Sequence, residues 1–166
     1  MKLFKLTVLA SLCFVLFTGL LSCEKEGEKD KVNVYTKSDI PMTGAQVAPV
    51  PSTSSATGKL SVYYDKRLKV LSYTISWTGL SGNPTGIGIF GPAPVGYAAL
   101  TPAGGLAPAI QTIAVTGLTT SGTYSGSVFI DGFAFQEQSL LNYLYYVRIT
   151  TAAFPTGELR AQVKFQ

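Results

Sequence analysis

The residues best suited to acid–base chemistry are the carboxylates in the main body of the chain, at Asp39, Asp65, Asp131, Glu137 and Glu158. A glycosidase needs two such groups facing each other at a defined separation. Asp65 begins the turn-like run Asp65-Lys66-Arg67, and Asp131 precedes Gly132, so both have the position of ordinary turn residues. The sequence predicts no catalytic residue. A hydrolase with carboxylates that cannot be paired from sequence stays open as an alternative.

Several other kinds of catalytic and cofactor site are excluded or disfavoured because the residues they need are absent. The 166 residues include no histidine, which excludes a Ser-His-Asp triad, histidine-ligated zinc or copper, and imidazole acid–base catalysis. Gly86 to Gly91 fits a dinucleotide-binding pattern, but Pro92 and Pro94 follow where a helix would have to begin. A Ser-x-x-Lys pair occurs only from Ser22 to Lys25, and no Gly-x-Ser-x-Gly is present. We expect no enzyme activity, no cofactor and no metal.

Glu158 and Arg160 are the charged pair with the clearest prospect of acting together. Two positions apart on a predicted strand, they would share one face of it. If that face points inward, the two should form a hydrogen-bonded ion pair, because an isolated buried charge costs several kcal/mol. We expect a structural ion pair rather than a ligand site.

Aromatic side chains are the other candidate for binding. One tryptophan and nine tyrosines could include a platform for sugars, but packing in the core and across strands is the simpler interpretation. The pairs Tyr63-Tyr64 and Tyr145-Tyr146 each place one ring on each face of a strand.

The first 22 residues have the pattern of a removable export signal. A short basic start with Lys2 and Lys5 leads into an apolar run of about 16 residues, shorter than the roughly 20 that a membrane-spanning helix needs. Leu20-Leu21-Ser22-Cys23 resembles the bacterial lipobox, in which cleavage frees the cysteine to carry lipid. We predict that Cys23 is lipidated and that the lipid anchors the protein in the bacterial cell envelope. The expected membrane is the outer membrane, with the domain on its periplasmic or its surface side.

The charge of the remaining chain argues against nucleic acid as a partner. Without residues 1–22, 11 basic and 9 acidic residues remain, an excess too small for a nucleic-acid surface. Residues 23–38 begin with charges of mixed sign and are expected to form a flexible tether. The domain is expected to span residues 39–166.

Strands dominate the elements that must position these residues. Leu71, Tyr73, Ile75 and Trp77 alternate with small polar residues and should face the core, within an antiparallel hairpin over residues 57–78. We expect a long surface loop over about 91–108 and one short helix within 135–143. Further strands are expected over 86–90, 110–115, 123–130, 144–150 and 158–165. About eight short strands without long helices predict an all-β fold, an antiparallel β-sandwich of two sheets.

Three segments in order resemble the CHRD (chordin-type) domain. They are Thr43 to Val50 followed by Ser55-Ala56-Thr57-Gly58, then Gly79-Leu80 with Gly91-Pro92-Ala93, and finally Tyr146 to Gln162. The last, Tyr-Val-Arg-Ile-Thr-Thr followed by Phe-Pro and Gly-Glu-Leu-Arg-Ala-Gln, is the most specific. The resemblance implies an immunoglobulin-like or Greek-key sandwich over nearly all of residues 40–166.

The chain departs from that family where the family carries histidines. Members commonly have His-Ile-His-Gly where this chain has Gly88-Ile89-Phe90-Gly91, and a histidine where it has Thr150. A metal role suggested by those histidines does not carry over. We therefore expect a non-catalytic binding or scaffold module with a protein or glycan ligand, the carbohydrate-binding module being the narrower alternative.

Overall fold

Alternation of apolar and polar residues produces the three long strands that begin the domain. The structure, a computed structural model, describes residues 33–165, in which β1 (Val34–Thr43), β2 (Thr57–Asp65) and β3 (Val70–Thr78) are antiparallel neighbours. The predicted hairpin is confirmed, with β2 and β3 in register from Thr57 opposite Thr78 to Asp65 opposite Val70. Asp65 Oδ1 accepts the N–H groups of Arg67 and Leu68, which fixes the turn between them.

The remaining elements are short and are separated by loops. They are η1 (Gly44–Gln46), β4 (Pro84–Phe90), β5 (Gln111–Ile113), β6 (Gly122–Phe129), α2 (Glu137–Leu141), β7 (Tyr146–Thr151) and β8 (Leu159–Gln162). The predicted helix and the predicted long loop are both confirmed. Residues 91–110, called here the long loop, contain one isolated strand-like bridge between Leu100 and Leu106.

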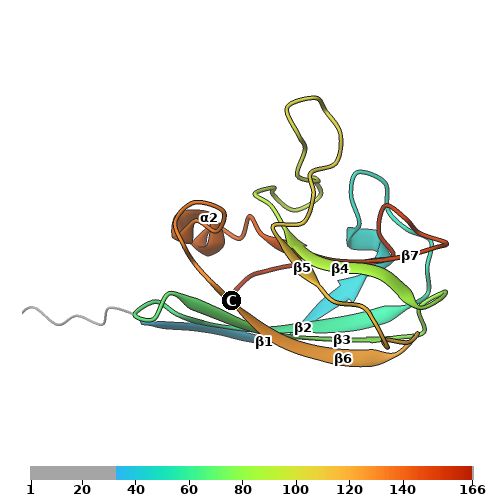
Figure 1. Cartoon of the computed structure of the whole chain (residues 1–166), viewed down its shortest axis with the longest axis horizontal. Coiled ribbons are helices and arrows are strands. Elements are labelled where there is room, and N and C mark those ends of the chain that lie inside the picture. The colour runs from blue at the N-terminus through green and yellow to red at the C-terminus, as the bar shows by residue number, and fades with distance from the viewer. Residues whose placement is uncertain (1–32, 166) are drawn as a thin grey trace, which may run out of the picture. The chain divides into compact units, whose positions relative to one another are not determined.

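The eight strands form one antiparallel sheet in the order β5-β4-β7-β8-β1-β2-β3-β6. The all-β prediction is confirmed, but the prediction of a sandwich of two separate sheets is wrong. β8 pairs with β7 on one side and with β1 on the other, so hydrogen bonding is continuous through what would have been the gap between sheets. The sheet folds back on itself into a nearly closed barrel, with β4, β5 and β7 above β1, β2, β3 and β6 (Figure 1).

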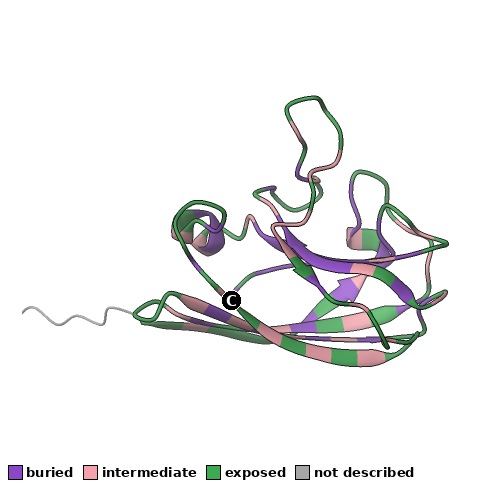
Figure 2. Ribbon diagram, viewed as in Figure 1, coloured by how far each residue is buried: buried purple, intermediate pink, exposed green. Residues whose placement is uncertain are grey.

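The core fills the space enclosed by this folded sheet. Alternate residues of the long strands point inward, and the predicted core face of Leu71, Tyr73, Ile75 and Trp77 is buried. Ile87, Ile89, Val147, Ile149 and Leu159 supply the opposite wall, so the two layers bury each other's apolar faces. On β6 the alternation leaves every second residue exposed (Figure 2).

The domain begins earlier than the sequence indicated. β1 starts at Val34, so residues 34–38, assigned to the tether, belong to the sheet, where Val34 to Lys37 pair with β2. The predicted signal (1–22), Cys23 and most of the tether lie outside the described residues. Over residues 33–165, no helix has the length and apolar character needed to cross a membrane.

Candidate functional site

Glu158 is buried at one end of the barrel, where hydroxyl groups surround its carboxylate. Its side chain is fully covered, and its carboxylate accepts four hydrogen bonds. Ser54 Oγ (2.7 Å) and the Ser81 N–H (2.8 Å) donate to Oε1, while Ser81 Oγ (2.8 Å) and Thr151 Oγ1 donate to Oε2. The carboxylate therefore joins three segments that are distant in the sequence.

The same contacts set the protonation state of Glu158. Burial alone raises the pKa of a carboxyl group, but the hydrogen bonds from Thr151, Ser54 and Ser81 outweigh it and lower the pKa of Glu158 below its ordinary value. Glu158 is thus held as an anion whose acceptor sites are already occupied by the protein. It has the environment of a structural group rather than of a general base.

Arg160 and Gln162, on β8, hold down the long loop. Arg160 Nη1 donates to the Tyr97 carbonyl (2.8 Å) and Nη2 to Gln162 Oε1 (3.0 Å). Gln162 Nε2 donates in turn to the Ala93 carbonyl (2.9 Å) and to the Tyr143 carbonyl (2.6 Å). The backbone carbonyl groups that accept these bonds lie in irregular segments and have no partner in a β-ladder. The two side chains therefore connect these segments to the sheet.

The structure buries both Glu158 and Arg160 but does not bring them together as the predicted ion pair. Their hydrogen-bond partners within residues 33–165 are separate. The physical reason is local: β8 begins at Leu159, so Glu158 precedes the strand and the alternation of side chains does not extend to it. The carboxylate turns to the hydroxyl groups, and the guanidinium lies 3.7 Å from the centroid of the Tyr146 ring.

The other carboxylates of the described chain also have structural partners. Asp39 contacts Lys59 Nζ (3.1 Å), and Glu137 accepts the Tyr64 hydroxyl (3.0 Å). Asp131 accepts the N–H groups of Phe133 and Phe135, which lower its pKa. Within residues 33–165, no three His, Cys, Asp or Glu side chains gather where they could hold a metal ion.

A feature that the sequence analysis missed is a broad face of hydroxyl groups. Adjacent strands β2, β3 and β6 align Lys59–Ser76–Thr123, Ser61–Thr74–Ser125 and Tyr63–Ser72–Ser127 in three rows on the outer side of the sheet. We call these nine residues the hydroxyl face, since all but Lys59 and Tyr63 are Ser or Thr. The alternation of Ser72, Thr74 and Ser76 along one strand indicated part of this face. It was interpreted only as the solvent side of the strand whose other side faces the core.

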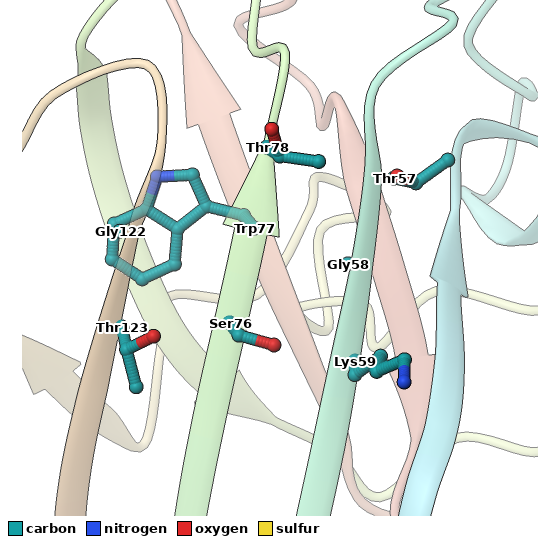
Figure 3. Close-up of a pocket in the computed structure, with 8 residues that line it drawn as sticks. All are labelled: Thr57, Gly58, Lys59, Ser76, Trp77, Thr78, Gly122 and Thr123. Atoms are coloured by element: carbon teal, nitrogen blue, oxygen red, sulfur yellow. The ribbon is translucent and has the colours of Figure 1, made fainter.

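An open groove of about 480 Å³ lies at one end of the hydroxyl face (Figure 3). Its lining comes from the ends of β2, β3 and β6: Thr57, Gly58, Lys59, Ser76, Trp77, Thr78, Gly122 and Thr123. The Trp77 ring reaches from β3 to β6, where a Cβ atom on Gly122 would lie only 2.8 Å from Cζ2 of the ring. A second depression of about 270 Å³ adjoins Tyr63, Thr74 and Ser125.

Most of the aromatic residues serve packing, as the simpler interpretation predicted. Trp77 is 3 % exposed and donates from Nε1 to the Thr119 carbonyl, and Tyr64, Tyr145 and Tyr146 are buried. Of the paired tyrosines, only Tyr63 has an exposed ring, at 46 % on the hydroxyl face. Tyr63 therefore presents an exposed aromatic ring beside the second depression.

One comparison with known proteins gives a result. A family model described as the CHRD domain matches residues 39–163, which agrees with the three segments identified in the sequence. No curated protein and no solved structure matches the chain.

Proposed function

This chain belongs to the CHRD domain family, and we propose that it acts as a non-catalytic binding module held at the bacterial cell envelope by a lipid on Cys23. The observation that carries the binding role is the hydroxyl face, an exposed polar surface on three adjacent strands that ends in an open groove. The anchor is supported by the apolar leader and the lipobox-like sequence before Cys23.

Carbohydrate is the ligand class that we propose for this surface. Sugars present many hydroxyl groups, and Ser and Thr side chains can both donate to and accept from them. Thr74 and Ser125 already share a hydrogen bond of 2.8 Å across β3 and β6, so donors and acceptors lie close together on a fixed frame. Tyr63 adds an exposed ring at the edge, suited to stacking on a pyranose.

A paired-carboxylate hydrolase is the weaker candidate. It needs two carboxyl groups that face each other across a bound sugar. The carboxylates of residues 39–158 contact turns, hydroxyl groups or lysines instead, and neither groove has one in its lining.

Binding can be tested by titrating the full chain, in a neutral detergent, with polysaccharides extracted from the envelope of the producing bacterium. We expect saturable binding that Tyr63→Ala weakens severalfold, since the ring is exposed beside the second depression. Phe133→Ala is the matched control, because Phe133 is 89 % exposed but lies in the turn before α2. Absence of binding, or equal losses in both variants, would contradict carbohydrate recognition by this face.

The anchor has a separate test. Mass spectrometry of the protein from bacterial membranes should find the mature N-terminus at Cys23 with acyl chains attached. A mature N-terminus elsewhere would overturn the lipoprotein proposal and leave the binding proposal standing.

A further inference from the structure

Two arginines meet on the outer side of the sheet, under the long loop and away from the hydroxyl face. Arg148 on β7 lies opposite Arg160 on β8, and Gly88 of β4 lies on the other side of Arg148. Both side chains are buried, with exposures of 8 % and 1 %. Within residues 33–165 no carboxylate pairs with either guanidinium, since Glu158 is bound by its hydroxyl groups.

The two cations are not equally satisfied. Arg160 has two hydrogen-bond acceptors and lies over the Tyr146 ring. Arg148 lies 4.1 Å from the centroid of the Phe90 ring, and its Nε and Nη1 are buried without a hydrogen-bond partner in the described chain. Buried N–H groups of a charged side chain rarely lack a hydrogen-bond partner.

Among the residues that the structure describes, Arg148 lacks a neighbouring anion as well as hydrogen-bond acceptors for Nε and Nη1. A guanidinium stays protonated in proteins, so burial does not remove the charge of Arg148. Burial lowers the pKa of Arg160, and proximity to Arg148 lowers it further, the effect expected of two cations that lack an anion between them. The aromatic rings offset only part of this cost.

We propose that Arg148, with Arg160 beside it, forms a binding site for an oxyanion, the chemistry shared by carboxylate and phosphate groups. Guanidinium groups bind such oxygens by charge-assisted hydrogen bonds and match their geometry. Arg148 keeps 8 % of its surface exposed, and binding as proposed requires a small ion to approach its buried Nε and Nη1 from that side. This site is distinct from the hydroxyl face and does not depend on the proposed carbohydrate ligand.

The test is thermal unfolding of the full chain in a neutral detergent, with sodium phosphate in one arm and sodium acetate in the other. Sodium chloride keeps the ionic strength constant, so that general screening does not change. We expect at least one oxyanion to raise Tm in a saturable way. In Arg148→Met the apparent Kd for that ion should rise at least tenfold, while Arg67→Met, at an exposed arginine of the β2–β3 turn, should leave it unchanged.

The variants separate loss of binding from loss of fold. Methionine keeps the length and packing of the stem and removes the unpaired charge, so the Tm of Arg148→Met without added oxyanion should equal or exceed that of the wild type. Should this variant not fold, Arg148→Lys, which keeps the charge but loses the guanidinium geometry, should still weaken binding at least threefold. No saturable effect of phosphate or acetate on the wild type, or an equal effect on an Arg148 variant, would overturn the proposal.

Discussion

Arg148 and Arg160 face each other across β7 and β8, and the aromatic rings on which they lie stack on each other. Arg148 lies over Phe90, Arg160 lies over Tyr146, and the two ring centroids are 5.5 Å apart. The outer side of this part of the sheet is thus a layer of cations and aromatic rings. The long loop covers it through the Ala93, Tyr97 and Ala99 backbone.

Replacing Glu158 by alanine should destabilise the domain. The substitution removes four hydrogen bonds to a buried carboxylate and takes the acceptor away from the buried hydroxyl group of Thr151. We expect a loss of about 2–4 kcal/mol in the free energy of unfolding. Chemical denaturation measures it, and Asp39→Ala, which removes only an exposed ion pair, should cost less than about 0.5 kcal/mol. An unchanged Tm for Glu158→Ala would argue against the structural role.

The stability contributed by Glu158 should depend on pH in the acid range. Its pKa is lowered by folding, so the unfolded chain binds the proton more tightly than the folded one. This contribution is complete above the ordinary pKa of 4.5 and is lost as the pH falls towards the lower folded value. Tm measured from pH 7 to pH 3 should fall in that window, and less steeply in Glu158→Gln. Parallel curves for the two proteins would contradict this assignment.

Gln162→Leu should free the long loop without unfolding the sheet. The leucine fills a similar volume but cannot donate to the Ala93 and Tyr143 carbonyls or accept from Arg160. We expect amide hydrogen exchange over residues 93–108 to accelerate at least tenfold, while exchange in β2 and β3 changes little. Gln111→Leu, which removes a bond to the neighbouring Thr112 carbonyl, is the control. Unchanged exchange in the loop would show that other contacts hold it.

Local patterns in the sequence were sufficient to predict the strands. They were not sufficient to predict that the strands form one nearly closed sheet. The alternation over Leu71 to Trp77 identified the core face, because a strand buried on one side has no other way to hide its apolar residues. Whether eight strands make two sheets or one depends on β8, which pairs with β7 through all four of its residues and with β1 through Arg160, and nothing in its sequence distinguishes the two cases. The tether was predicted to extend to residue 38, whereas residues 34–38 belong to β1.

The candidate sites were less accessible to prediction for a related reason. The spacing of Glu158 and Arg160 predicted a shared face of one strand, but their partners come from residues far away in the chain, such as Ser54 and Tyr97. The hydroxyl face similarly requires β6 to lie beside β3, a pairing that brings Ser125 to Thr74 across 51 residues. Sequence pattern indicates which residues face outward, and topology decides which of them share a surface.

The most direct test of the binding role is the affinity of two matched variants for envelope polysaccharide. Thr123 and Thr112 are both exposed strand residues, but Thr123 lines the groove on the hydroxyl face and Thr112 lies on β5 at the far edge of the sheet. Arginine at position 123 should block the groove and weaken binding at least tenfold, whereas Thr112→Arg should bind as the wild type does. Equal affinity of Thr123→Arg and the wild type would contradict the proposal that this groove is the binding surface.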